Sequence, residues 1–117
     1  MEIWINPACS KCRAATAALD ESGQEYTTRR YLDDPPTADE LTAVLARLGL
    51  EPWDIVRTSE EPYAALRGVP KDPEHRPQWI DAMVTNPILI QRPIITTDDG
   101  TTAIARDPQT LSRLLGN

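Results

Sequence analysis

The chain has 117 residues and a mass of 13.0 kDa, which suit one folded domain with a single hydrophobic core. Its formal charge of −6 and isoelectric point of about 4.7 argue against a nucleic-acid partner, because proteins that bind nucleic acid carry a basic surface. No apolar run approaches the roughly 20 residues that a membrane helix requires, and the first residues lack the segments of a signal peptide. We therefore expect a cytoplasmic protein without a membrane partner.

The beginning of the chain predicts a strand, a helix and a second strand. Residues 3–5 are apolar and strand-like. Residues 10–21 are rich in alanine, which favours helix, and Gly23 is suited to end that helix in a left-handed conformation. The tyrosines and β-branched threonines over residues 26–31 predict the second strand.

Helical patterns dominate the middle of the chain. Thr37 followed by Glu40 is a capping box, and the helix that it begins is expected to end at Gly49. Further helices are expected over residues 52–56, about 60–66 and 78–84. Residues 67–77 hold three prolines and a glycine, so we expect a loop there, with His75 on the surface.

The last third of the chain predicts a hairpin followed by a helix. Residues 94–96 and 101–105 are strand-like, and Asp98-Asp99-Gly100 between them is a hairpin turn signal. Asp107 followed by Pro108 is typical of a helix N-terminus.

These elements follow one another as β-α-β, then helices, then β-β-α. The sequence has no repeats and no linker-like change of composition. It therefore predicts a single α/β domain over residues 1–117, with a helical insertion at about 36–86.

Two cysteines, Cys9 and Cys12, carry the strongest chemical signal in the chain. With one histidine beside them they are too few for the common zinc sites, so no metal is expected. Cys9 falls where the first strand meets the first helix, and the free N–H groups of a helix N-terminus favour a thiolate and can bind a tetrahedral anion. Lys11 and Arg13 add positive charge. Such surroundings lower a thiol pKa from about 8.5 to about 3.5–7.5, so we predict that Cys9 is redox-active.

Cys12 lies one helical turn after Cys9 and on the same helix face. The two Cα atoms are then about 5–6 Å apart, which a disulfide can span. A free cysteine is also among the most buried residue types, so Cys12 could equally serve as a small apolar residue of the core. The sequence leaves both the role of a resolving thiol and the role of a packing residue open.

Four segments of the chain follow one another in a specific order. They are Asn6-Pro7-Ala8-Cys9-Ser10-x-x-Arg13, then Tyr31-Leu32 with Pro35-Pro36-Thr37, then Arg57-x-x-Glu60-Glu61-Pro62-Tyr63, then Asn86-Pro87-Ile88-Leu89-Ile90-Gln91-Arg92-Pro93-Ile94-Ile95. Over nearly its full length the chain closely resembles the glutaredoxin-coupled arsenate reductases. The resemblance implies a thioredoxin-like fold with a mixed β-α-β … β-β-α sheet and a helical insertion. It also implies a cis peptide bond before Pro93.

The resemblance assigns roles to six residues. Cys9 matches the nucleophile, Arg57, Arg92 and Arg106 match the arginines that hold the oxyanion, and Asn6 and Ser10 fall in the loop that cradles it. A planar guanidinium binds two oxygens of such an anion at once, which lysine does not. The chain departs from the family at Ile5, where a histidine often precedes Asn-Pro, so the Cys9 thiolate must depend on the helix and the arginines.

The implied activity is arsenate reduction without a bound cofactor. The Cys9 thiolate attacks arsenate, and an external thiol such as glutathione, with a glutaredoxin- or thioredoxin-like protein, completes the reduction to arsenite. Two alternatives stay open: an Spx-type redox-sensing transcription regulator that binds RNA polymerase, and a thiol oxidoreductase of unknown substrate. The Cys-x-x-Cys and the short chain favour the regulator, whereas Asn6-Pro7, Arg57 and the Glu-Pro-Tyr segment favour the reductase.

Overall fold

The computed structural model describes residues 1–116 and contains two compact units. One unit combines Met1–Asp34 with the chain from Arg92 onward, and the other consists of Pro35–Gln91. Asn117, the last residue of the expected domain, lies outside the described residues. None of the helices in this described part has both the length and the apolar character to span a lipid bilayer.

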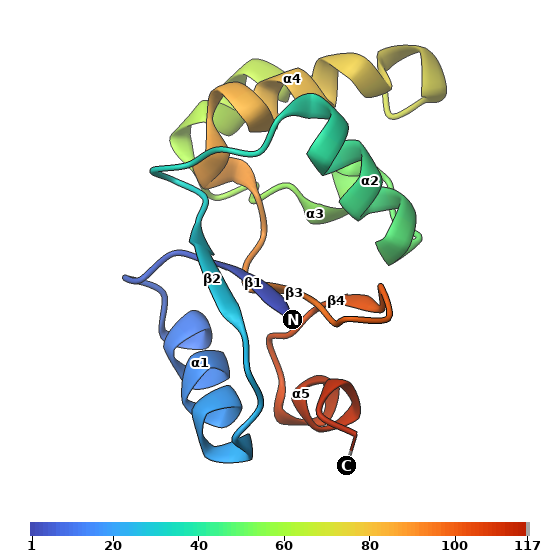
Figure 1. Ribbon diagram of the computed structural model, residues 1–117. Coiled ribbons are helices and arrows are strands. Elements are labelled where there is room, and N and C mark those ends of the chain that lie inside the picture. Colours follow the sequence, from blue (N-terminus) through green and yellow to red (C-terminus); the bar gives the residue numbers. More distant parts are fainter. Residues whose placement is uncertain (117) are drawn as a thin grey trace. The chain divides into compact units, whose positions relative to one another are not determined.

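The first unit contains a four-stranded mixed sheet (Figure 1). Its strands are β1 (Glu2–Ile5), β2 (Thr27–Arg30), β3 (Ile94–Thr96) and β4 (Thr102–Ile104). They lie in the order β2-β1-β3-β4, in which β1 runs parallel to β2 and antiparallel to β3, and β3 runs antiparallel to β4. The α/β class and the β-α-β … β-β-α order expected for this sheet are confirmed.

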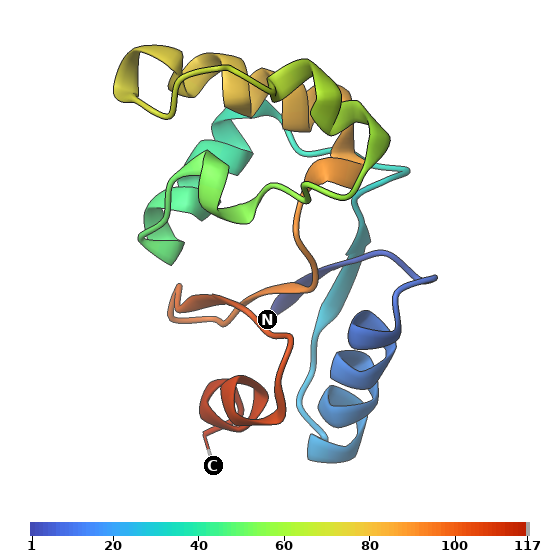
Figure 2. The same ribbon diagram turned by 180° about the vertical axis from the view of Figure 1, so that it is seen from behind.

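Two helices, α1 (Ser10–Ser22) and α5 (Pro108–Leu114), lie against one face of this sheet (Figures 1 and 2). Between sheet and helices is a core of buried side chains from both layers: Ile3, Ile5, Cys12, Ala15, Leu19, Ile95 and Ala105. Leu111 and Leu114 of α5 pack against the same cluster. Removing this apolar surface from water fixes α1 on the sheet, and with it the residues at its N-terminus.

The ends of these helices follow from local signals. The backbone at Gly23 has a φ of 73°, the left-handed conformation that lets the chain leave α1, and its N–H donates to the carbonyl of Asp20. At α5 the side chain of Asp107 accepts the N–H of Thr110, and Pro108 occupies the first helical position. Both ends agree with the sequence prediction.

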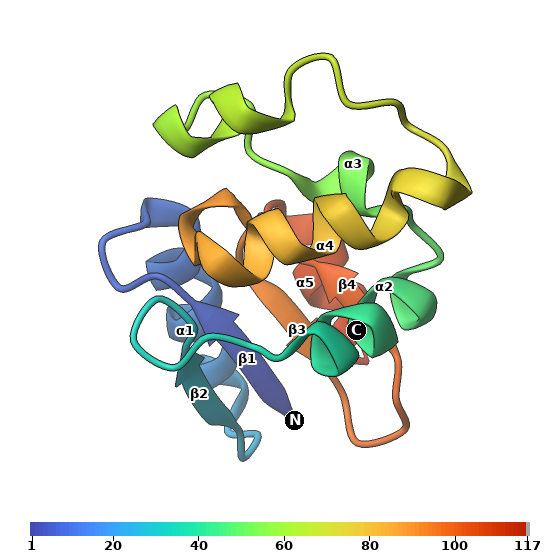
Figure 3. The ribbon, with the colours of Figure 1, turned by 90° about the horizontal axis from the view of Figure 1, so that it is seen from above.

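The second unit is helical (Figure 3). It contains α2 (Ala38–Leu48), α3 (Pro52–Ile55) and α4 (Arg76–Thr85), with 3₁₀ turns over Glu61–Leu66, Pro73–His75 and Pro87–Leu89. α4 contacts both α2 and α3. The predicted capping box is present at α2, where Thr37 accepts the N–H of Glu40 and the Glu40 carboxylate accepts the N–H of Thr37.

The loop expected over residues 67–77 is wrong in its last part. The Asp72 side chain accepts the N–H of His75, and Pro73 begins a 3₁₀ turn that leads directly into α4. Pro77 lies in the first turn of α4, where a backbone N–H has no partner within the helix and proline is therefore tolerated. His75 thus lies in a helical turn, with its Nδ1 2.6 Å from an Asp72 carboxylate oxygen.

Candidate active site

Cys9 lies at the junction between strand β1 and helix α1. It is the N-cap residue of α1, with extended backbone angles of φ −86° and ψ 124°. Its carbonyl accepts the N–H of Arg13 at 3.1 Å, and its own N–H donates to the carbonyl of Asn6 at 2.9 Å. The Cys9 thiol is therefore held at the positively polarised end of the helix, where the sequence predicts it.

The loop before Cys9 is fixed by two further hydrogen bonds. The side-chain oxygen of the buried Asn6 accepts the N–H of Ala8 at 3.0 Å. The guanidinium of Arg13 donates to the carbonyl of Pro7 at 3.2 Å. Ser10, the first residue of α1, is exposed beside this loop. The backbone around the thiol is thus held from the strand side and from the helix side.

The Cys9 sulfur is surrounded by hydrogen-bond donors. Partial burial acts to raise the pKa of Cys9, but hydrogen bonds outweigh burial and bring the pKa from 9.0 to about 7. The largest contribution that lowers the pKa comes from the backbone of Cys12, followed by the side chain of Arg92, the Cys12 thiol and the backbone of Lys11. About half of the Cys9 side chains are therefore thiolate at neutral pH.

Cys12 has the opposite character. Its side chain is only 1% exposed, and its sulfur accepts the N–H of Asn6 at 3.5 Å. Burial raises the pKa of Cys12 from 9.0 to about 11, and the charge of Cys9 acts in the same direction, while the bond from Asn6 opposes them. Both cysteines are free thiols, and they are hydrogen-bonded to each other.

Arg92, which follows the helical unit in the sequence, belongs to the same unit as Cys9 and contacts its thiol. Its peptide bond to Pro93, just before β3, is cis, which confirms the expectation from the resemblance. The side chain is buried, with 7% exposed, and hydrogen-bonds to Cys9 and to Tyr31. Burial acts to lower the pKa of Arg92, but the contacts with Tyr31 and Cys9 outweigh it and raise the pKa.

Tyr31 is a site residue that the sequence analysis left without a role. It is fully buried and lies one residue after β2. β1 and β2 are parallel and pair Ile5 with Arg30, so the residues that follow the two strands lie at the same edge of the sheet. The position of Tyr31 at the end of a predicted strand parallel to the first was the signal that could have placed it at the same end of the sheet as Cys9.

Arg106 belongs to the same unit and follows β4 after one residue. Its Nη1 donates to the carbonyl of Arg92 at 2.5 Å. The structure therefore brings Arg92 and Arg106 together, and connects both with Cys9 through the Arg92 side chain.

Arg57 belongs to the second unit, where three contacts fix it. Its N–H donates to the carbonyl of Leu89 at 2.7 Å, beside an antiparallel bridge between Val56 and Ile90. Its Nη1 donates to the side-chain oxygen of Gln91 at 2.8 Å, and its Nε lies 3.5 Å from a carboxylate oxygen of Glu60. Its place among the oxyanion-binding arginines stays a prediction.

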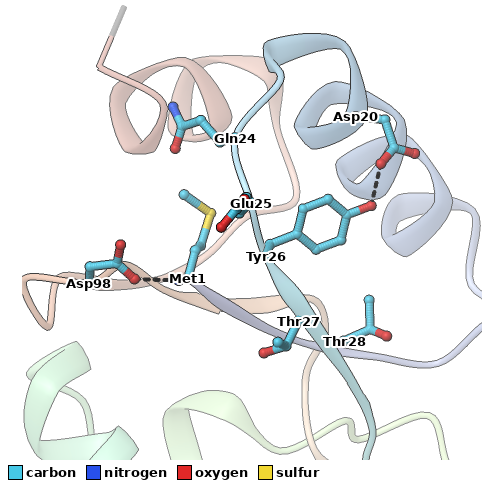
Figure 4. A pocket seen from close by; sticks show the side chains of 8 residues that line it. All are labelled: Met1, Asp20, Gln24, Glu25, Tyr26, Thr27, Thr28 and Asp98. Carbon is cyan, nitrogen blue, oxygen red and sulfur yellow. Dashed lines mark hydrogen bonds and ion pairs between the residues drawn. The ribbon is translucent and has the colours of Figure 1, made fainter.

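A cavity of about 810 Å³ in the first unit has a different character (Figure 4). It lies by the C-terminal part of α1, whereas Cys9 is at the N-terminus of that helix. The residues that line it are Met1, Asp20, Gln24, Glu25, Tyr26, Thr27, Thr28 and Asp98. Inside it the Tyr26 hydroxyl donates to Asp20 at 2.5 Å, and the N-terminal amine pairs with Asp98. This lining offers carboxylates and no thiol or guanidinium, so it does not suit an oxyanion.

Comparisons with known proteins show the family of this chain. Residues 4–114 match the ArsC family. An arsenate reductase from Escherichia coli is 40% identical over 99 residues, which are 85% of this chain and 70% of that protein. An uncharacterized protein in the glnII region of Streptomyces viridochromogenes is 59% identical over 109 residues, or 91% of each chain. The solved structure of an arsenate reductase from Vibrio cholerae has a TM-score of 0.81 at 31% identity and covers 99% of this chain and 97% of its own. The chain belongs to the ArsC family.

Proposed function

We propose that this protein is an arsenate reductase with Cys9 as its nucleophile. The observation that carries the proposal is the Cys9 thiol at the N-terminus of α1, where a pKa of about 7 and a hydrogen bond with Arg92 prepare it to attack an anion. Membership of the ArsC family, and 40% identity to an arsenate reductase, support arsenate as the substrate. We assign the activity to the cytoplasm, where thiols are kept reduced.

The first step is a displacement at arsenic. The Cys9 thiolate forms an S–As bond, one As–O bond breaks, and the leaving hydroxide takes up a proton to become water. The arsenic remains As(V) in this step. Negative charge stays on the arsenic oxygens, and guanidinium groups that donate to them lower the barrier.

The second step is the reduction. A thiol sulfur attacks the Cys9 sulfur, an S–S bond forms, and the S–As bond breaks with its electron pair moving to arsenic. Arsenic is thereby reduced to As(III) and leaves as arsenite, while two thiols are oxidised. ArsC-family enzymes use an external thiol reductant, and a glutaredoxin- or thioredoxin-like protein, with glutathione or an equivalent thiol, is the form that we propose here.

Three arginines are proposed to hold the oxyanion. Arg92 is supported by its hydrogen bond with Cys9, and Arg106 by its bond to the Arg92 carbonyl. Arg57 enters the proposal through the family resemblance. Asn6 and Ser10 shape the loop that would receive the anion, through the turn at Asn6 and the start of α1.

Arsenate turnover tests this function directly. NADPH consumption is followed with arsenate and either glutathione, glutaredoxin and glutathione reductase, or thioredoxin and thioredoxin reductase. We expect turnover, and we expect phosphate to compete without turning over, because it has the same shape but thiols do not reduce its phosphorus. An inactive wild-type protein in both systems would exclude the reductase and favour the redox-regulator or oxidoreductase alternatives.

A further inference from the structure

The two cysteines of α1 contact each other at the start of the helix. Cys9 is the N-cap of α1 and Cys12 is the third residue of that helix, and the thiols of the two residues interact. The two sulfurs are thus already within hydrogen-bonding reach, and both are free. An S–S bond between them requires a movement of two side chains and no rearrangement of the sheet.

The surroundings of Cys12 suit a sulfur that becomes negatively charged. The N–H of Asn6 donates to this sulfur at 3.5 Å, and a hydrogen bond of this kind strengthens when the acceptor is an anion. The positive charge of Arg92 also favours a Cys12 thiolate. A residue that serves only as apolar filling in the cluster with Ala15 and Leu19 has no use for either group.

Solvent reaches the two sulfurs unequally. The Cys12 side chain is 1% exposed, whereas Cys9 is only partly buried. A dissolved thiol can therefore reach Cys9 and cannot reach Cys12. Any reaction of Cys12 must be with Cys9, its neighbour within the protein.

We infer that Cys12 releases arsenite from arsenylated Cys9, and that the resulting Cys9–Cys12 disulfide makes a dithiol protein of the thioredoxin class the reductant. This inference rests on the proposed arsenate reductase function and names its reducing partner. An internal thiol in contact with the reacting sulfur has a far higher effective concentration than any dissolved thiol.

The electrons and protons of this route balance. The Cys12 thiolate attacks the Cys9 sulfur, the S–S bond forms, and the S–As bond breaks with its electron pair moving to arsenic, which leaves as arsenite. The Cys12 proton passes to an arsenite oxygen. A thiolate of the reductant then attacks Cys9, the accessible sulfur, and Cys12 leaves as a thiolate that takes up the proton lost by the reductant's thiol. The second thiol of the reductant closes its own disulfide and frees Cys9.

The charges around the pair also set the order of events. Burial is the main reason for the raised pKa of Cys12, and the negative charge of Cys9 and the hydrogen bond between the two sulfurs add to it. Once the Cys9 sulfur is bonded to arsenic it no longer carries that charge. The bond from Asn6 and the charge of Arg92 remain, so Cys12 ionises more easily after Cys9 has reacted than before.

A single turnover without any reductant tests the inference. Fully reduced wild-type protein, freed of small thiols, is mixed with arsenate alone, and its mass and the arsenite formed are measured. We expect one arsenite per chain, the loss of two hydrogens and a Cys9–Cys12 cross-link in the peptide map. Cys12→Ser should show no loss of two hydrogens and release no arsenite, and Cys9 can at most carry the arsenic adduct. Wild-type protein that keeps both thiols until glutathione is added would overturn the inference.

Steady-state turnover supplies the matched comparison. Cys12→Ser should lose about a hundredfold or more of the turnover coupled to thioredoxin, because the internal thiol is gone, and should retain measurable turnover with glutathione and glutaredoxin. Ala15→Ser, which puts a hydroxyl into the same buried cluster, is the control and should keep its thioredoxin-coupled turnover. Equal thioredoxin-coupled rates for Cys12→Ser and wild type would overturn the inference.

The two hypotheses fail in different ways. A wild-type protein that reduces arsenate with glutathione and glutaredoxin, but forms no Cys9–Cys12 disulfide, refutes only the role of Cys12. A wild-type protein that forms the disulfide in a dithiol redox buffer, but never reduces arsenate, refutes the proposed function and the arsenite-releasing step together. The single-turnover result on wild-type protein holds even if Cys12→Ser fails to fold.

Discussion

Cys9 and Cys12 are three residues apart at the start of α1, and their surroundings move their pKa values in opposite directions from 9.0. Cys9 has a pKa of about 7 because N–H groups and the Arg92 side chain surround its sulfur, despite partial burial. Cys12 has a pKa of about 11, chiefly because its sulfur is buried. One sulfur is therefore prepared to attack at neutral pH and the other is kept protonated, although both belong to the same residue type.

The first prediction concerns the ionisation of Cys9. Its alkylation by iodoacetamide should rise with a midpoint at about pH 7, because only the thiolate reacts, while the buried Cys12 is alkylated far more slowly. Peptide-level mass spectrometry across a pH series measures both sites in one sample. Cys9→Ser should abolish arsenate reduction while its circular dichroism spectrum stays that of the wild type. A midpoint near the ordinary value of 9.0, or residual turnover in Cys9→Ser, contradicts the assignment.

The second prediction concerns the arginines. Lysine at position 92 keeps the charge but loses the planar fork, so kcat/KM for arsenate should fall by about ten- to a hundredfold, or about 1.5–3 kcal/mol. The same substitution at Arg57 or Arg106 should act similarly. Only Arg92→Lys should also raise the alkylation midpoint of Cys9, because Arg92 is the arginine in contact with that sulfur.

Arg67→Lys is the control for this series. Arg67 is exposed, follows the 3₁₀ turn over Glu61–Leu66 and has no part in the proposal. Its kcat/KM should stay within about twofold of the wild type, as expected of a surface substitution. Near-neutral results for lysine at all three proposed positions would place the oxyanion site elsewhere.

At the scale of single elements, local signals predicted the structure well. The capping residues Thr37 and Asp107 and the glycine at position 23 have short-range partners, so a sequence window contains everything that decides them. The prediction of a loop was wrong over residues 73–77 because its three prolines and glycine over residues 67–77 were read as helix breakers without regard to their positions. Two of them occupy first-turn positions, where proline costs nothing.

The third prediction tests one of these signals. Thr37→Ala removes the side-chain acceptor for the Glu40 N–H, and should lower the free energy of unfolding by about 0.5–2 kcal/mol in urea denaturation. Thr42→Ala, in the middle of the same helix, is the control and should cost no more than about 0.5 kcal/mol, since alanine is the better helix former. Both variants should keep the alkylation midpoint of Cys9. A larger loss for Thr42→Ala than for Thr37→Ala would contradict the capping argument.

At the scale of the whole molecule, strand register explains which parts of the site the sequence could not reveal. β3 and β4 pair Ile94 with Ile104, and the same register extended by two residues sets Arg92 opposite Arg106. The hairpin was predicted, but its register was not, so the contact between the two arginines was not foreseen. The pairing of β1 with β2, which brings Tyr31 to the site, is likewise a long-range choice that no local window contains.

The last prediction joins the Cys9 site to the stability of the protein as a whole. Folding brings the pKa of Cys9 from 9.0 to about 7, so between these pH values the unfolded chain binds more protons than the folded one. Stability from this group is therefore fully present above about pH 9 and is lost as the pH falls through about 7.

Urea unfolding of wild type and of Cys9→Ser, with a reductant that contains no thiol, measures this contribution as a difference between the two proteins. The free energy of unfolding of wild type relative to Cys9→Ser should rise by about 1–2 kcal/mol from about pH 6 to about pH 9, after allowance for solvent screening of a partly exposed sulfur. Contributions from groups that the two proteins share cancel in the difference. The pKa of Cys12 is about 11 in the folded protein, so its contribution to the free energy of unfolding decreases only above that pH range. A difference that stays constant or shrinks as the pH rises would mean that the folded protein does not favour the Cys9 thiolate.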